Sequence, residues 1–372
     1  MHQAFILLCI TSLITLLVAY LVTNNMISNK AGFCIYLLSI FIVSFIYQPV
    51  AGGDLGRYFK MLDIMKYLPF TSMNGYATDP ELFVTNFIFW IIAKSGIYHL
   101  LPAISTTTVY GVGYYLISDY LVRIKDRNPF GLMLVLQFMQ LPLIPIIENV
   151  RNIWAFSIII LAIYREIIQK RKNLFTYVMY IVPCFMHSSA FVLVLFRIIL
   201  PLVGKLVFVL PLVLIFIRQF INFLFVHQDK LPSLFASAIS KGYTYLWNNT
   251  SNEWLSYVNT SSFFKVQKIM EMSFTLVFIL MFFIIRKQLT RDSALFSDFL
   301  YLVLLSVIAC NIFEAPHYWR YYAASMLMIP VFILSVKFTK NRMAFYILKY
   351  FYVLASLFMF MLNTWNTYST YS

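Results

Sequence analysis

Long apolar stretches constrain this chain more than any other feature. A transmembrane helix needs about 20 apolar residues, and these stretches are rich in Leu, Ile and Phe, without the alternation typical of outer-membrane barrel strands. Twelve have spanning or near-spanning length, at about residues 4–22, 32–47, 100–121, 130–147, 153–168, 174–187, 189–200, 206–226, 272–285, 295–312, 321–336 and 344–362. Only 11% of the residues are charged, against about 25% in soluble domains. The sequence therefore predicts one all-α polytopic membrane domain over residues 1–372, with about 12 transmembrane helices.

Two stretches do not fit a single regular span. Residues 82–98 are apolar but contain Lys94 and Gly96, which predicts an interfacial or re-entrant helix. Residues 174–200 contain Pro183 and the step His187-Ser188-Ser189, so this stretch forms either one kinked helix or two short ones.

The basic residues cluster in alternate loops. If the termini lie outside, the inner loops hold fifteen of the 28 Lys and Arg residues, namely Lys30, Arg123, Lys125, Arg127, Arg165, Lys170, Arg171, Lys172, Lys205, Arg286, Lys287, Arg291, Lys337, Lys340 and Arg342. Because basic loops are retained in the cytoplasm, this distribution predicts that both termini lie on the outer side of the membrane. It also accounts for the positive net charge without nucleic acid, for which no basic run interleaved with exposed aromatics is present.

Two predicted outer segments, 48–98 and 227–271, are too long to be simple connectors. We expect the function to lie there, on the periplasmic side. The sequence has no Walker motif, no HExxH, no Gly-rich nucleotide loop and no metal-spaced His/Cys cluster, and its four cysteines are scattered singly in apolar runs. We therefore expect no cofactor, no metal and no disulfide.

The first polar cluster at the predicted outer face runs from Gly52 to Tyr58. Its glycines allow a tight backbone path, and Asp54, Arg57 and Tyr58 offer a carboxylate, a guanidinium and a phenol within one turn. The alternative is that Asp54 caps a helix that begins near Leu55, while Arg57 is an interfacial anchor.

The second cluster, Glu148 to Asn152, lies between two apolar runs. Ionisable residues at membrane depth usually face a partner or a cavity. Glu148 and Arg151 form an ion pair in one interpretation. In the other, Arg151 binds an anionic ligand, because its planar guanidinium binds phosphate in a bidentate way.

Two further clusters follow. His187 is either a hydrogen-bonded structural histidine or a proton-transfer or phosphate contact, and without an adjacent Asp it does not suggest a Ser-His-Asp nucleophile. The segment from Glu314 to Tyr322 is dense in aromatic and polar residues. An aromatic belt explains Tyr321 but not Arg320, which stands at the head of a predicted span and is a candidate anion ligand.

The order of these motifs resembles the EpsG family, itself similar to a branch of the Wzy-type O-antigen and capsule polymerases. The resemblance covers about residues 48–325 and rests on Gly53-Asp54-x-x-x-Tyr58, Pro80-Glu81-Leu82-Phe83, Val150-Arg151-Asn152, Met186-His187-Ser188-Ser189-Ala190-Phe191 and Trp319-Arg320-Tyr321-Tyr322. The chain departs from the family pattern at Leu55, where Tyr is common, and at Asn152, where Gln is common.

The resemblance implies a multi-pass polymerase of the bacterial inner membrane. Such an enzyme joins oligosaccharide repeat units carried on undecaprenyl pyrophosphate at the periplasmic face, and a chain-length regulator protein is an expected partner. We expect Arg151 and Arg320 to hold the pyrophosphate and Asp54 to act as the base. We expect His187, Tyr58, Arg57 and Tyr321 to orient the phosphate or the sugar, with Glu148 and Glu314 as rival carboxylates.

Three other functions remain open at this stage. A flippase for lipid-linked oligosaccharide uses the same outer cations without chemistry. An O-antigen ligase resembles a polymerase at this level. A glycan-modifying acyltransferase requires a His reached from the cytoplasm, whereas His187 falls outside in the predicted topology.

Overall fold

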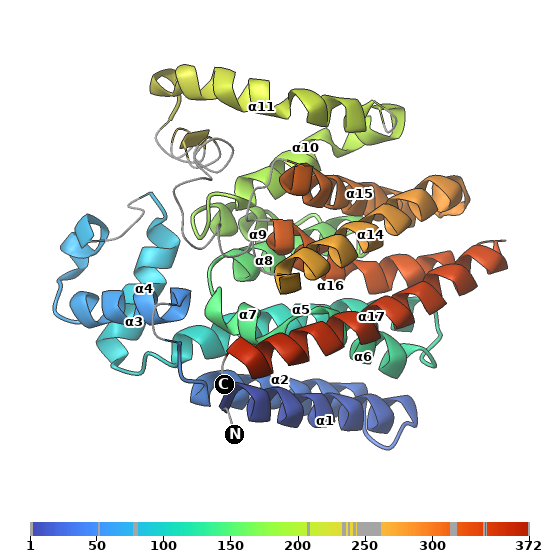
Figure 1. The fold of residues 1–372 in the computed structure, drawn as a ribbon, viewed down its shortest axis with the longest axis horizontal. Coiled ribbons are helices and arrows are strands. Elements are labelled where there is room, and N and C mark those ends of the chain that lie inside the picture. The colour runs from blue at the N-terminus through green and yellow to red at the C-terminus, as the bar shows by residue number, and fades with distance from the viewer. Residues whose placement is uncertain are drawn as a thin grey trace.

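The chain folds into a bundle of helices (Figure 1). The computed structural model describes residues 3–50, 53–76, 81–206, 209–232, 236, 239–240, 243, 262–312, 318–337, 339 and 341–370. Every regular element in these ranges is a helix, in the order α1 (Gln3–Thr23), α2 (Asn29–Ile46), α3 (Asp54–Met65), η1 (Phe70–Tyr76), α4 (Phe83–Ser95), α5 (Leu100–Arg123), α6 (Phe130–Gln140), α7 (Leu143–Glu148), α8 (Asn152–Ile167), α9 (Leu174–Cys184), α10 (Ala190–Leu206), α11 (Leu210–Val226), η2 (Gln228–Lys230), α14 (Ser262–Ile285), η4 (Arg286–Gln288), α15 (Arg291–Ile312), α16 (Tyr318–Val336) and α17 (Arg342–Thr370).

The predicted apolar stretches overlap helices, and α14 begins at Ser262, ten residues before the predicted stretch 272–285. Six helical segments, at α1, α2, α14, α15, α16 and α17, are long and apolar enough to cross a membrane. The stretch 130–147 divides into α6 and α7, because Pro142 has no backbone N–H and cannot continue the helix. The stretch 174–200 also forms two helices, α9 and α10. The protein is therefore an all-α membrane protein, while the full count of twelve crossings stays a prediction.

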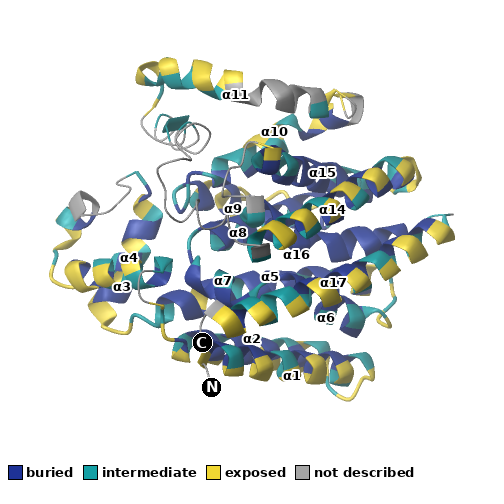
Figure 2. Ribbon diagram, in the orientation of Figure 1, coloured by how far each residue is buried: buried dark blue, intermediate teal, exposed yellow. Residues whose placement is uncertain are grey.

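Burial separates an inner from an outer layer of helices. In the apolar window of α16, 89% of the residues are buried inside the protein, against 28% in that of α17. Large apolar side chains point outward from the outer helices, among them Leu13 on α1 and Leu354 on α17, each 67% exposed. Figure 2 shows this layering, with buried residues along the central helices and exposed ones along α1 and α17. Exposed leucines on spanning helices are the surface that lipid tails cover.

The two ends of the bundle contain different elements. At one end lie α3 and α4, outside the main bundle (Figure 1); we call this the α3 end. We call the other the basic end, because the segments that connect the helices there are the predicted inner loops, in which the Lys and Arg residues cluster. Contacts there join segments far apart in sequence: Thr23 with Gly131, Asn29 with Ser118, Asp126 with Lys337, and Lys170 with Asp292.

Among the described residues, contacts at the α3 end likewise join segments that are far apart in sequence and lie at the predicted outer ends of helices. Gln3 donates to the carbonyl of Ile46 at 2.7 Å, and Thr85 donates to the carbonyl of Met186 at 2.7 Å. The sides of the membrane on which the two ends of the bundle lie stay a prediction. The segment 82–98 forms the short helix α4 at this end, in agreement with a helix that does not span.

Candidate functional site at the α3 end

Glu148 ties the start of α3 to the end of α7. Its side chain is 6% exposed. Its carboxylate accepts hydrogen bonds from the Tyr47 hydroxyl at 2.7 Å and from the backbone N–H groups of Val50 and Leu55, both at 3.3 Å. The first N–H groups of a helix have no partner within the helix, so a carboxylate 93 residues away serves as the cap of α3.

This arrangement corrects two expectations. The helix begins at Asp54, and the residue that caps its N–H groups is Glu148 rather than Asp54. The carboxylate of Glu148 is also occupied by Tyr47 and two amides within the described part of the chain, instead of forming the ion pair with Arg151 that the spacing suggested.

Gly53 makes room for this carboxylate. A Cβ atom at residue 53 would lie 2.8 Å from Oε2 of Glu148 and 3.2 Å from the carbonyl oxygen of Val50. The first of these distances is closer than non-bonded contacts allow. Gly53 therefore lets the carboxylate of Glu148 come close to the backbone before Asp54. The sequence had suggested that a ligand would come close there. Gly52 lies outside the described residues.

Asp54 and Arg57 form an ion pair on the outer surface of α3. The side chains are 27% and 71% exposed, respectively. Exposed pairs three residues apart on a helix contribute only about 0–1 kcal/mol. The pair is thus a weak contact that leaves both groups near the surface of the α3 end.

Tyr58 connects α3 to α8 and α4. Nε of Arg151 donates to the Tyr58 hydroxyl at 2.9 Å, and the guanidinium carbon lies 5.0 Å from the centre of the Tyr58 ring. The same ring packs edge-on against Phe89 of α4, with centroids 5.3 Å apart. Because Arg151 directly precedes α8, its charge adds to the positive end of that helix dipole. The guanidinium of Arg151 and the N-terminal end of α8 therefore lie beside Tyr58.

His187 lies in the short connection between α9 and α10. Its Nδ1 accepts a hydrogen bond from the backbone N–H of Ser189 at 3.2 Å. Thr85 of α4 holds the preceding residue through the carbonyl of Met186. A neutral imidazole that accepts at Nδ1 carries its proton on Nε2. In this tautomer Nε2 is a hydrogen-bond donor.

Arg320 and Tyr321 stand in the first turn of α16. Tyr321 is 7% exposed and packs against Phe156 of α8, with ring centroids 5.4 Å apart. It therefore fixes α16 against α8 instead of offering a surface to a sugar. Glu314 lies outside the described residues.

The sequence-predicted residues are thus linked to different degrees. Three separate contacts lie at the start of α3: Glu148 with the N–H of Leu55, Asp54 with Arg57, and Tyr58 with Arg151. The His187 segment is joined to this group through α4, and Arg320 and Tyr321 adjoin α8. Three partners were missed by sequence reasoning: Tyr47, Thr85 and Phe89, which looked like ordinary residues of apolar stretches. Within the described ranges, no group of three or more His, Cys, Asp or Glu side chains is arranged to hold a metal ion.

No protein-family model, curated protein or solved structure matches this chain.

Proposed function

We propose that the protein is a polysaccharide polymerase of the bacterial inner membrane that transfers an undecaprenyl-pyrophosphate-linked glycan to an acceptor repeat unit at the periplasmic face. Twelve crossings, with the α3 end facing the periplasm, belong to the same proposal. The family resemblance of the sequence suggests this activity. The contact of Arg151 with Tyr58 supports it best, because it joins two of the motifs on which the resemblance rests, 93 residues apart.

The cations of this region fit a diphosphate leaving group. Arg151 stands at the positive end of α8 and presents a planar guanidinium, and Arg320 stands in the first turn of α16. In the proposed reaction, a hydroxyl oxygen of the acceptor sugar bonds to the anomeric carbon of the donor. The bond from that carbon to the pyrophosphate oxygen breaks, and the lipid diphosphate leaves with its negative charge next to the two arginines.

The hydroxyl proton needs an acceptor, and we assign Asp54 to this role. Its carboxylate is 27% exposed and has Arg57 as a weakly held partner. Arg57 and Tyr58 then orient the sugar. His187, with its proton on Nε2, donates to a phosphate oxygen. Glu148 holds α3 in place, so it acts by positioning Asp54.

Reconstitution tests the activity. Purified protein in liposomes is supplied with lipid-linked repeat units, and the length of the product is measured. Longer chains on the lipid carrier support a polymerase. Movement of the substrate across the bilayer without elongation indicates a flippase, transfer to a lipid A core acceptor indicates a ligase, and an acylated glycan indicates an acyltransferase; each of these three results refutes the proposal.

Substitutions test the base. Loss of a general base costs about 10² to 10⁴ in rate, so Asp54→Asn should leave a membrane-inserted protein that yields almost only single repeats. Arg57→Ala is the control, because a purely structural pair predicts equal damage and lower protein abundance in both variants. Long chains from Asp54→Asn, with short ones from Glu148→Gln or Glu314→Gln at normal abundance, would transfer the base to that glutamate.

A further inference from the structure

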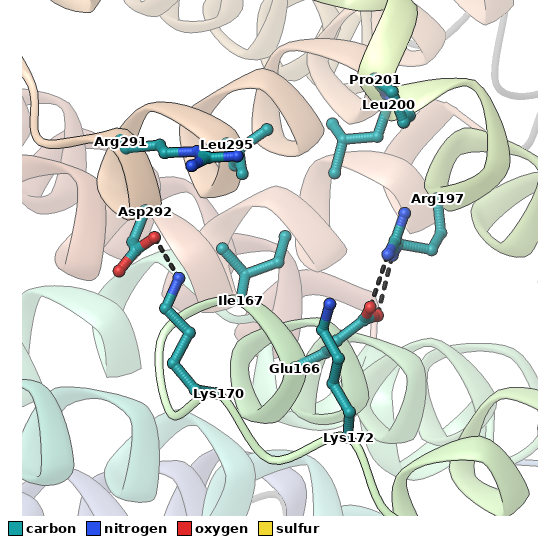
Figure 3. Close-up of a pocket in the computed structure, with 10 residues that line it drawn as sticks. All are labelled: Glu166, Ile167, Lys170, Lys172, Arg197, Leu200, Pro201, Arg291, Asp292 and Leu295. Carbon is teal, nitrogen blue, oxygen red and sulfur yellow. Dashed lines mark hydrogen bonds and ion pairs between the residues drawn. The ribbon is translucent and has the colours of Figure 1, made fainter.

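The basic end contains a cavity that the proposed reaction does not use. Its volume is about 460 Å³. Figure 3 shows the ten side chains around it, which come from the end of α8, the connection to α9, the second half of α10 and the start of α15. They are Glu166, Ile167, Lys170, Lys172, Arg197, Leu200, Pro201, Arg291, Asp292 and Leu295.

Two ion pairs build the walls of this cavity. Arg197 binds Glu166 in a bidentate way, with Nη2 to Oε1 at 2.5 Å and Nε to Oε2 at 2.8 Å. Lys170 pairs with Asp292, which joins the connection after α8 to the start of α15. These contacts neutralise both carboxylates of the lining and tie three separate segments of the chain together.

Two of the cations lining the cavity are left over. Lys172 and Arg291 are exposed, and neither forms a hydrogen bond or a close ion pair with another described residue, although the charge of Lys172 also acts on the Glu166 carboxylate. With four basic and two acidic side chains in the lining, the cavity carries an excess of two positive charges. An arginine and a lysine around one concave space are the groups that bind phosphate oxygens.

Lys170 has a backbone conformation that is unfavourable for a residue with a side chain. Its φ angle is +60°, a left-handed conformation that usually falls to Gly or Asn at the end of a helix. The turn is stabilised because the N–H of Arg171 bonds to the carbonyl of Arg165 at 2.8 Å. A glycine at position 170 would adopt this conformation more easily, but it would lack the side chain that pairs with Asp292.

The remaining wall of the cavity is apolar. Ile167, Leu200, Pro201 and Leu295 line it, and α10 continues outward with Leu195, Ile198 and Leu202, which are 53%, 67% and 51% exposed. A charged recess next to an apolar outer surface matches a phospholipid, whose phosphate lies at the membrane boundary and whose acyl chains lie beside the helices. Basic pockets between helices on the cytoplasmic side bind such headgroups.

We propose that this cavity binds the phosphate group of an anionic phospholipid of the inner leaflet, with Lys172 and Arg291 as its ligands. The paired Arg197 and Lys170 shape the recess and add positive potential. The site takes no part in the proposed reaction, because it lies at the opposite end of the bundle, but its place in the inner leaflet rests on the orientation proposed above.

The test compares lipids bound to the full-length protein in a neutral detergent, by native mass spectrometry. The wild-type protein should bind phosphatidylglycerol in preference to phosphatidylcholine with the same acyl chains. Each basic side chain near anionic lipid contributes about fivefold in affinity, so the double variant Lys172→Gln/Arg291→Gln should bind phosphatidylglycerol about 25-fold more weakly. Both wall ion pairs are kept in this variant, and gel filtration checks its fold.

The matched control is Lys125→Gln/Arg127→Gln, which removes two exposed charges at the same end but outside the cavity. Its affinity for phosphatidylglycerol should stay within about twofold of wild type, because it leaves both proposed ligands in place. An equal loss in both double variants, or equal binding of the two lipids by the wild-type protein, overturns the proposal; the second comparison needs no variant. Binding of inorganic phosphate as tight as that of phosphatidylglycerol would make free phosphate the ligand and refute the lipid assignment.

Discussion

Replacing Glu148 by Gln tests how α3 is held in place. The glutamine keeps the shape of the side chain and one oxygen, which still accepts from the Tyr47 hydroxyl and the Val50 amide at Oε1. The second oxygen becomes an NH₂ group that faces the N–H of Leu55, so two donors meet where a donor and an acceptor met before. Leu55 is fully buried, and water cannot replace the lost partner.

The size of the effect follows from these three contacts. A buried donor without a partner costs about 1–3 kcal/mol, and hydrogen bonds to a charged acceptor contribute about 1.5–3 kcal/mol against about 0.5–1.5 for neutral ones. We therefore expect Glu148→Gln to destabilise the docking of α3 by about 2–3 kcal/mol. The opening equilibrium of α3 should rise about 30- to 150-fold.

Hydrogen exchange measures this opening directly. The peptide covering residues 54–65 should exchange faster by that factor in Glu148→Gln, while a peptide from α5 should be unchanged. Tyr47→Phe serves as the matched variant, because it removes the 2.7 Å hydroxyl contact with Glu148, and the loss of this contact should cost about 1–2 kcal/mol. The double variant should be destabilised by less than the sum of the two single variants, because both substitutions weaken the same hydrogen bond between Tyr47 and Glu148.

One result would refute this reasoning. If Glu148→Gln leaves the exchange of α3 unchanged but abolishes polymerisation, the carboxylate acts in the chemistry and is not the cap of α3. Tyr47→Phe would then also leave α3 unaffected.

Three further predictions concern the same end and the topology. Gly53→Ala should speed exchange in α3 as Glu148→Gln does, because its methyl group would lie 2.8 Å from the Glu148 carboxylate; normal exchange would show that the loop adapts. Arg151→Lys and Arg320→Lys should each lose most polymerisation at equal protein level, because Lys keeps the charge without the planar fork, and normal chain lengths in both would rule out pyrophosphate binding. A reporter inserted after Lys172 should report the cytoplasm and one after Lys230 the periplasm; the opposite readings would invert the proposed orientation.

Hydropathy predicted the helices of this protein well, because a stretch with no polar side chains has few alternatives in lipid. The division of 130–147 into α6 and α7 was also within reach, since Pro142 interrupts that stretch. The pair of Glu166 and Arg197 left a further signal, as both are ionisable residues inside apolar stretches and such residues usually have a partner.

The construction of the site was beyond sequence reasoning for a physical reason. The spacing of Glu148 and Arg151 suggests a local ion pair, and nothing in the local pattern shows that residues 47–55 pass close enough to supply three better donors. The partners of Glu148 lie 93 to 101 residues away. Periodicity and spacing report on neighbours within a few turns, whereas this contact depends on how whole helices pack.

The different surroundings of Glu148 and Asp54 bear on which of them can accept a proton. Glu148 already accepts three hydrogen bonds, two at Oε1 and one at Oε2, so a substrate hydroxyl bound to this carboxylate would compete with donors that hold the start of α3. Asp54 has a partner, Arg57, that is 71% exposed and can move away at a cost of about 0–1 kcal/mol. A sugar hydroxyl can therefore reach the Asp54 carboxylate without disturbing the fold, whereas the Glu148 carboxylate is held by donors of the protein itself. The two variants should accordingly differ. Asp54→Asn should shorten the glycan while the hydrogen exchange of α3 stays normal, and Glu148→Gln should both shorten the glycan and speed the exchange of α3.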